Sequence, residues 1–271
     1  MAHFRINFKS KALGMEMSCE VILPQHSAVT GRDHPKYKTL WLLHGGGDDA
    51  SRWGRQTSIE RYASERGIAV VMPCVHLSGY TDMNHGGKYF TFVADELPAL
   101  MRKWFPLSDA REDNYIAGLS MGGEGCMKIG LARPENYCAI GCMSAGGITD
   151  SEPMGKKKWF FLSPWELAKR NEMMYGNSFP YGGKEDISAN AILIARDGLP
   201  APRIFHAVGT EDFGLAAARA GRDFYQSFPG NPFDYAYREY PGAHKWNFWD
   251  EHIQDFLDYC GLPRQVEGFR D

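Results

Sequence analysis

The stretch Gly118-Leu119-Ser120-Met121-Gly122-Gly123 decides the fold of this chain. It has the pattern G-x-S-x-G, follows the strand-like run 114–117 and precedes the helix-like run 124–133. A strand that turns sharply into a helix brings backbone segments so close that side chains do not fit, and the flanking glycines meet that need. In this context the pattern predicts a nucleophile elbow that presents Ser120 at the edge of a sheet. The alternative is a Gly/Ser turn without chemical meaning.

Strand-like and helix-like segments alternate along the rest of the chain. Continuous apolar runs predict strands that are buried on both faces, and these are separated by longer amphipathic segments. Strands are expected at 17–23, 39–44, 68–72, 114–117, 138–143, 203–208 and 234–240, and helices at 58–66, 92–104, 213–228 and 252–259. This alternation predicts an α/β fold with a mostly parallel, doubly wound sheet, in one domain that spans residues 1–271.

The segment 146–202 interrupts the alternation, because it contains no clear buried strand. It is rich in large apolar side chains, such as Trp159, Trp165 and Tyr175, among glycines and charged residues. A long insertion of this kind after a sheet strand favours a cap over the active site. An ordinary connection with one or two packed helices is the alternative.

Composition and charge are those of an ordinary globular protein. Of the 271 residues, 44% are hydrophobic and 23% are charged, and the net charge is −3, which gives no sign of a nucleic-acid partner. The basic run 156–158 is expected to be a solvated loop. The chain opens directly into a strand-like segment without an apolar leader, and no stretch approaches the roughly 20 apolar residues of a membrane span. We therefore expect a cytoplasmic protein with no membrane partner.

The six cysteines are scattered, and none forms a C-x-x-C pair. Cys138 and Cys142 fall in one expected strand, where extended geometry places them about 13 Å apart. A disulfide requires Cα atoms within about 7 Å. We expect six reduced thiols in the core and no metal site.

A serine nucleophile needs a histidine base, and the base needs an orienting carboxylate. His244 follows the last expected strand, whereas His206 lies inside an apolar strand and is expected in the core, and His252 falls in the last helix and is expected at the surface. The acid should follow the preceding strand, where Asp212 and Glu211 compete. The carboxylate that is not used would lie favourably at a helix start.

Two backbone N–H groups should bind the oxyanion of the reaction. One is the amide of Met121, the residue after the nucleophile. The other is expected in the glycine-rich loop 44–49, where Gly46 is the first choice and Gly45 the second. A phosphate-binding loop is excluded because no Gly-Lys-Ser/Thr follows.

The sequence resembles the tributyrin-esterase and esterase D branch of the α/β-hydrolases, which is related to feruloyl and acetyl-xylan esterases. The matching stretches are LWLLHGGGDDASRW (40–53), VVMPCVHLSGYTDMNHGGKYFTFVADELP (70–98), YIAGLSMGGEGCMKIGLARPENY (115–137), VGTEDF (208–213) and GAHKWNFWDEHI (242–253). The resemblance implies a serine carboxylesterase that acts on short acyl or aromatic acyl esters. Its catalytic residues fall on Ser120, Asp212 and His244, and its oxyanion donors on Gly46 and Met121.

The resemblance implies a small-molecule ester substrate and no cofactor, and similar esterases are commonly dimers or tetramers. The segment 146–202 does not match the family, so the acyl group remains open. Gly45, Tyr80, Asp82 and Trp246 are candidate pocket residues. The alternatives are an S-formylglutathione hydrolase, which shares the elbow and the triad, and a non-catalytic α/β-hydrolase that binds a partner.

Overall fold

The computed structural model of the protein describes residues 1–24, 36–149, 163–262 and 264. The basic run at 156–158, expected as a solvated loop, and part of the expected cap, 150–162, lie outside these residues. Within the described chain, no helix is long and apolar enough to cross a membrane.

Within the described residues, eight strands form one mixed sheet with the order β1-β2-β4-β3-β5-β6-β7-β8. The pairs β1/β2 and β2/β4 are antiparallel, and all the others are parallel. The strands are β1 (Ala2–Lys9), β2 (Glu16–Leu23), β3 (Thr39–Leu43), β4 (Ala69–Pro73), β5 (Asn114–Leu119), β6 (Ala139–Met143), β7 (Arg203–Gly209) and β8 (Ala236–Tyr240). The α/β fold expected from the alternation is confirmed.

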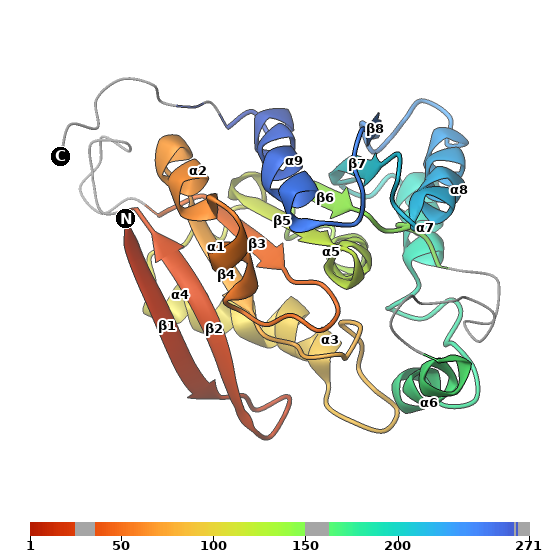
Figure 1. Ribbon diagram of the computed structural model, residues 1–271, viewed down its shortest axis with the longest axis horizontal. Coiled ribbons are helices and arrows are strands. Elements are labelled where there is room, and N and C mark those ends of the chain that lie inside the picture. The colour runs from red at the N-terminus through yellow and green to blue at the C-terminus, as the bar shows by residue number, and fades with distance from the viewer. Residues whose placement is uncertain (25–35, 150–162, 263, 265–271) are drawn as a thin grey trace.

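Helices cover both faces of the sheet. One apolar cluster joins the sheet to α1, α2 and α9, and a second joins it to α4, α5, α7 and α8. The α-helices are α1 (Arg52–Gln56), α2 (Ile59–Arg66), α3 (Tyr89–Thr91), α4 (Leu97–Trp104), α5 (Met121–Ala132), α6 (Pro164–Tyr175), α7 (Ile187–Asp197), α8 (Leu215–Gln226) and α9 (Trp246–Tyr259). Figure 1 shows α6 standing apart from the sheet, at the lower right.

The central strands are buried along their whole length. Every residue of β3, β4, β5 and β6 is buried, as expected for parallel strands with helices on both faces. The sequence runs that predicted these strands therefore consist of apolar residues without alternation. The parallel strands end at one edge of the sheet, and this edge carries the loops of the candidate site.

Three expectations about local structure need correction. Helix α9 begins at Trp246, six residues before the expected start, so His252 lies in its middle. The side chain of His252 is only 5% exposed and stacks on Tyr240, so the surface position expected for it was wrong. Pro73 is the last residue of β4 and did not stop the strand before it.

The helix expected at 92–104 is present, but it has a π-helical stretch, η2 (Phe92–Glu96), between α3 and α4. Pro98 lies at the start of α4, directly after this stretch. Proline has no N–H to donate and its ring crowds the preceding turn, so a wider turn before it accommodates the ring without ending the helix. The helix therefore continues through Pro98, with the π-helical stretch η2 ending just before it.

The described part of the insertion consists of α6, α7 and the turns between them, and it adds no strand to the sheet. Ser163 begins α6 with a capping box, in which its hydroxyl accepts from the Glu166 amide and the Glu166 carboxylate accepts from the Ser163 amide. The end of α6 contacts the loop after β4, where the amides of Asn84 and His85 donate to the carbonyls of Met174 and Met173. Helix α6 is thus attached to a loop at the carboxyl edge of the sheet.

Candidate active site

Ser120 occupies the turn between β5 and α5 with φ 53° and ψ −117°. This is a strained conformation for a residue with a side chain, and such strain is typical of functional turns. A Cβ on Gly118 would lie 2.3 Å from the Gly122 carbonyl oxygen, and a Cβ on Gly122 would lie 2.5 Å from that of Leu43. Both positions therefore require glycine, as the sequence pattern predicts.

The loops after β5, β6, β7 and β8 are joined in sequence by backbone hydrogen bonds. The amide of Ser120 donates to Met143 at the end of β6, and the amide of Ser144 donates to Ala207 near the end of β7. The amide of Thr210 in turn donates to the carbonyl of Tyr240, the last residue of β8. These contacts hold the loop that carries Ser120 and the loops that follow the last two strands at one edge of the sheet.

Asp212 and His244 come together across this edge. His244 Nδ1 lies 3.0 Å from both carboxylate oxygens of Asp212, and the Gly214 amide donates to Asp212 Oδ1 at 2.7 Å. Burial favours the neutral acid, but the hydrogen bonds from His244 and Gly214 outweigh it and hold the pKa of Asp212 below its usual value. Asp212 is therefore a buried carboxylate, whereas its competitor Glu211 is exposed.

Because Asp212 accepts hydrogen bonds through its carboxylate, the Nδ1 of His244 carries the proton and Nε2 is left to accept one. Among the described residues, no hydrogen bond joins the Ser120 hydroxyl to His244. Catalytic hydrogen bonds are often long without substrate and tighten when it binds. The structure thus brings Asp212 and His244 together and places Ser120 on the loop after β5, at the same edge of the sheet.

Aromatic rings surround the imidazole of His244. The ring of Phe213, which is 52% exposed, lies 4.2 Å from it between centroids, and Trp249 meets it edge to face at 4.9 Å. Trp246 packs edge to face on both Trp249 and Trp53, and it is half-buried. Trp246 therefore lies one ring away from His244, which supports the expectation that it is near the site.

The glycine-rich loop after β3 lies against the elbow. A Cβ on Gly45 would be 2.6 Å from the Leu119 side chain, just before Ser120. His44 is buried, its Nε2 accepts from the Val75 amide, and its Nδ1 lies 2.7 Å from the Gly45 carbonyl. Nδ1 is therefore the protonated nitrogen, and burial lowers the pKa of His44 to about 4, so that it stays neutral.

This contact of His44 sets the direction of one peptide group. The carbonyl of Gly45 is held by His44 Nδ1–H, and in a trans peptide the N–H of the next residue points the opposite way. The Gly46 amide is therefore turned away from His44. Gly46 is exposed, whereas Met121 is buried at the first position of α5.

Two candidate pocket residues have other contacts. Tyr80 is fully buried, packs beneath α5 and donates its hydroxyl hydrogen to the His44 carbonyl at 2.9 Å, so it supports the loop and does not line an open pocket. The carboxylate of Asp82 accepts from the amide and hydroxyl of Thr91 and from Lys184. Both side chains thus stabilise loops next to the elbow: Tyr80 is fully buried there, and a pocket role for the partly exposed Asp82 stays a prediction.

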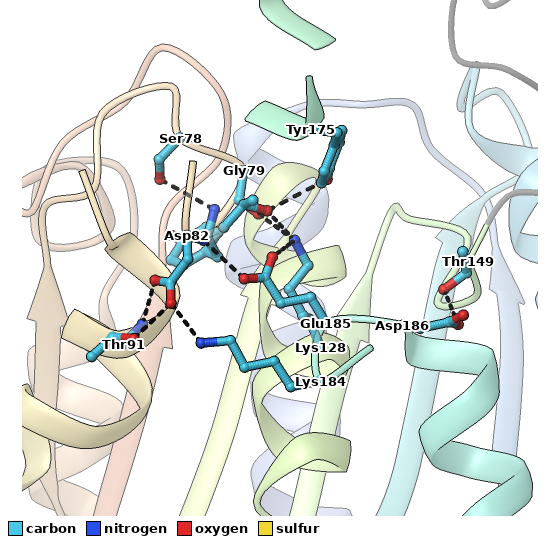
Figure 2. A network of polar contacts seen from close by, with 12 residues as sticks. Ser78, Gly79, Asp82, Thr91, Lys128, Thr149, Tyr175, Lys184, Glu185 and Asp186 are labelled. Atoms are coloured by element: carbon cyan, nitrogen blue, oxygen red, sulfur yellow. Dashed lines mark hydrogen bonds and ion pairs between the residues drawn. The ribbon is translucent and has the colours of Figure 1, made fainter. Parts of the chain in front are cut away.

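A buried polar network connects α5 to that loop and to the segment before α7 (Figure 2). Lys128 of α5 donates to the carbonyl of Gly79 at 2.8 Å and to the hydroxyl of Thr81 at 2.5 Å. Its Nζ lies 3.8 Å from Glu185 Oε2, and both side chains are 5% exposed. Glu185 Oε1 accepts from the Asp82 amide. Helix α5, which begins directly after Ser120, is thereby tied to two separate loops.

His206 is a core residue, as expected. It is completely buried, with Nε2 2.8 Å from the Ala145 carbonyl and Nδ1 2.7 Å from the Tyr235 hydroxyl. Burial lowers its pKa to about 4.

All six cysteines are free thiols, and five are buried, whereas Cys138 is half-buried. Among the described residues, no group of three His, Cys, Asp or Glu side chains is arranged to hold a metal ion.

Sequence reasoning missed two residues of the site region. Ser144 lies against the loop of Asp212, and Lys128 anchors α5, the helix that follows Ser120. In the sequence, Ser144 is visible only as a serine after a buried strand and Lys128 only as a lysine within an apolar helix. Neither pattern indicates which residue the side chain contacts. The partners come from loops far away in the chain, so only the fold reveals the contacts.

A strained serine between a parallel strand and a helix, with a histidine paired to a buried aspartate at the same edge of the sheet, is typical of serine hydrolases with the α/β-hydrolase fold. The chain belongs to the Esterase family, because the sequence model of that family matches residues 10–259. Carboxylic ester hydrolysis is the activity of this class.

The individual relatives share less than a third of their residues with this chain. The chain is 29% identical over 266 residues to an acetyl esterase of Caldicellulosiruptor saccharolyticus, with 96% of this chain and 98% of the relative covered. The solved structure of FphF, a fluorophosphonate-binding serine hydrolase of Staphylococcus aureus, superposes with a TM-score of 0.83 at 29% identity, covering 96% of this chain and 98% of that one.

A second solved structure, S-formylglutathione hydrolase (FrmB) of Staphylococcus aureus, has a TM-score of 0.79 at 29% identity over 96% of this chain and 98% of that one. A solved ferulic acid esterase shares the fold as well. The relatives thus carry three different substrate names, so the family settles the type of reaction and leaves the substrate to be argued from the site.

Proposed function

We propose that the protein is a serine carboxylesterase that hydrolyses short-chain acyl or aromatic esters, of the feruloyl or acetyl-sugar type, through Ser120, His244 and Asp212. The observation that carries this is the contact of His244 Nδ1 with both oxygens of the buried Asp212, at the edge of the sheet where a tight turn holds Ser120 at φ 53°. This contact fixes the tautomer in which Nε2 can take the proton of a serine.

In the first half-reaction, Ser120 Oγ attacks the ester carbonyl carbon while His244 Nε2 takes its proton. The tetrahedral oxyanion is bound by the N–H groups of Gly46 and Met121, and loss of one such donor typically costs about 2.7–4 kcal/mol of transition-state stabilisation. The C–O bond of the ester then breaks, and the imidazolium gives its proton to the departing alcohol. Asp212 stabilises the imidazolium throughout.

In the second half-reaction, water attacks the acyl-enzyme. His244 takes a proton from the water, the tetrahedral intermediate collapses, and the carboxylic acid leaves as Ser120 recovers its proton. The ring of Phe213, which is half exposed, lies 4.2 Å from the imidazole of His244 between centroids. An aromatic ring at this place supports a substrate with an apolar or planar group.

The second candidate is an S-formylglutathione hydrolase, and the likeness to the staphylococcal enzyme of that name favours it. A thioester would react through the same intermediates, with a thiol in place of the alcohol as leaving group. A non-catalytic binding protein is less well supported, because the acid and base are joined by hydrogen bonds. The segment 146–202 is proposed as a cap that shapes the acyl site.

The test is a panel of p-nitrophenyl esters from acetate to octanoate, methyl ferulate and S-formylglutathione. Each substrate is assayed with the wild type, with Ser120→Ala and with Ser227→Ala, a matched control at an exposed serine. We expect turnover of short acyl or feruloyl esters that disappears in Ser120→Ala and is unchanged in Ser227→Ala. Turnover of S-formylglutathione alone would assign the second candidate, and turnover that survives in Ser120→Ala would refute the triad.

A further inference from the structure

Ser144 is the first residue after β6 and lies beside the acid of the proposed triad. Its side chain is buried, its amide donates to the Ala207 carbonyl, and its φ is 53°. A positive φ in a residue other than glycine is uncommon and marks a position that the surrounding structure determines. The loop of the acid is close, because a Cβ on Gly214 would lie 3.1 Å from Asp212 Oδ1 and 3.5 Å from the Ser144 carbonyl oxygen.

The Ser144 hydroxyl is oriented by an indole. Trp249 of α9 donates its Nε1–H to Ser144 Oγ at 2.9 Å, and the contact is buried. An indole nitrogen can only donate, so Ser144 Oγ must accept in this bond. The hydroxyl has one hydrogen, and that hydrogen is therefore directed to a different neighbour.

The loop of Asp212 lies against Ser144 at Gly214, and the Ser144 side chain contributes to the lowered pKa of Asp212, which indicates this carboxylate as the neighbour. Asp212 Oδ1 also accepts from the Gly214 amide, and both oxygens lie within reach of His244 Nδ1. An ionised carboxylate only accepts hydrogen bonds and has about four lone-pair sites, so a third donor can be accommodated. With donors on several sides, the carboxylate is held in one rotamer.

Trp249 has a second contact in the same group, since its ring meets the imidazole of His244 edge to face at 4.9 Å. One side chain thus touches the base directly and reaches the acid through Ser144. Helix α9 begins only two residues after His244, so the two contacts are set by the same short segment.

We propose that Ser144 and Trp249 are positioning residues for the Asp212–His244 pair. In this arrangement Trp249 Nε1–H donates to Ser144 Oγ, and the Ser144 hydroxyl directs its own hydrogen toward the Asp212 carboxylate, which faces His244 Nδ1–H. The role rests on the proposed function, because it has meaning only if Asp212 and His244 act with Ser120. Neither residue touches the substrate, so both should affect kcat and leave KM unchanged.

The experiment compares Ser144→Ala, Trp249→Phe and the double variant on the best ester of the panel. A hydrogen bond to a charged group is worth enough that Ser144→Ala should lower kcat on the order of tenfold, at unchanged KM. Trp249→Phe keeps a ring beside His244 but removes the donor, and should lower kcat about threefold. In the Ser144→Ala background, Trp249→Phe should cost nothing further, because the indole acts on Asp212 through the hydroxyl.

Trp104→Phe, at an exposed indole on α4, and Ser227→Ala serve as controls and should leave kcat and KM unchanged. Unchanged kcat in Ser144→Ala, or independent losses that multiply in the double variant, would overturn the positioning role. If Ser144→Ala does not fold, Trp249→Phe decides alone: a lower kcat at constant KM supports the role, and an unchanged kcat overturns it. Activity that survives in Ser120→Ala refutes the proposed function itself, which separates the two failures.

Discussion

Replacement of Lys128 by methionine should destabilise the protein, because it leaves Glu185 buried without its cation. In the wild type the Glu185 side chain is 5% exposed, and its Oε2 lies 3.8 Å from Lys128 Nζ and has no hydrogen-bond partner among the described residues. Burial raises the pKa of Glu185 even with Lys128 beside it. Without the ammonium group, the carboxyl should take up a proton on folding.

The cost can be bounded from this protonation. In the unfolded chain the glutamate is ionised above a pKa near 4.3, whereas in the folded variant it is neutral. The free energy of unfolding is therefore lowered by about 1.36 kcal/mol for each pH unit above 4.3. The limit is therefore about 3.7 kcal/mol at pH 7, which agrees with the roughly 3–5 kcal/mol known for breaking a buried pair. At pH 4.5 the same contribution falls to a few tenths of a kcal/mol, since the unfolded carboxyl is then about half protonated.

The assay is urea unfolding of Lys128→Met at pH 7 and pH 4.5, beside Glu185→Gln and the double variant. The glutamine keeps an acceptor for the Asp82 amide, so the double variant should be more stable at pH 7 than Lys128→Met alone. Lys169→Met, in an exposed pair with Glu172, is the matched control and should have no measurable effect. A loss in Lys128→Met that is equal at both pH values, or that adds fully to the loss in Glu185→Gln, would refute the reasoning.

Two further predictions concern the elbow and the core. Gly122→Ala should abolish turnover and soluble folding, because its Cβ would lie 2.5 Å from the Leu43 carbonyl oxygen. Gly54→Ala is the control, since its Cβ would meet no atom closer than 3.8 Å, and it should match the wild type in soluble expression and in turnover. His206 has a folded-state pKa of about 4, below its unfolded value of about 6.5, so its neutral form stabilises the fold above pH 6.5 and this contribution is lost as the pH falls toward 4. The gap in unfolding free energy between wild type and His206→Gln should shrink by about 3 kcal/mol from pH 7 to pH 4 in urea titrations, and a constant gap would contradict the shift.

The sequence was most informative where one local conformation demands one residue type. Gly118 and Gly122 are required because backbone atoms leave no space for a Cβ, and this requirement is visible in the pattern around Ser120. The buried strands were predicted from apolar runs because both faces of a parallel strand are covered. The positions after successive strands placed the acid at Asp212 or Glu211 and the base at His244, and the family resemblance favoured Asp212, which is the carboxylate that His244 contacts.

Contacts between distant loops could not be predicted in this way. Tyr80 was a candidate pocket residue, and nothing in the sequence indicates that its hydroxyl donates to the carbonyl of His44, 36 residues earlier in the chain. Ser144 and Trp249 are 105 residues apart, and neither residue type indicates the other. Such pairs depend on how loops pack, which local propensity and periodicity do not determine.

The most direct measurement of the central claim is the site of covalent labelling by a fluorophosphonate. Such a reagent forms a stable adduct with a serine that is activated by a histidine base, so the protein is incubated with it, digested and mapped by mass spectrometry. The expected result is one adduct per chain, on Ser120, that is absent in Ser120→Ala and strongly slowed in His244→Gln. No adduct on the active wild-type enzyme, or an adduct on another serine, would contradict the assignment of Ser120 as the nucleophile.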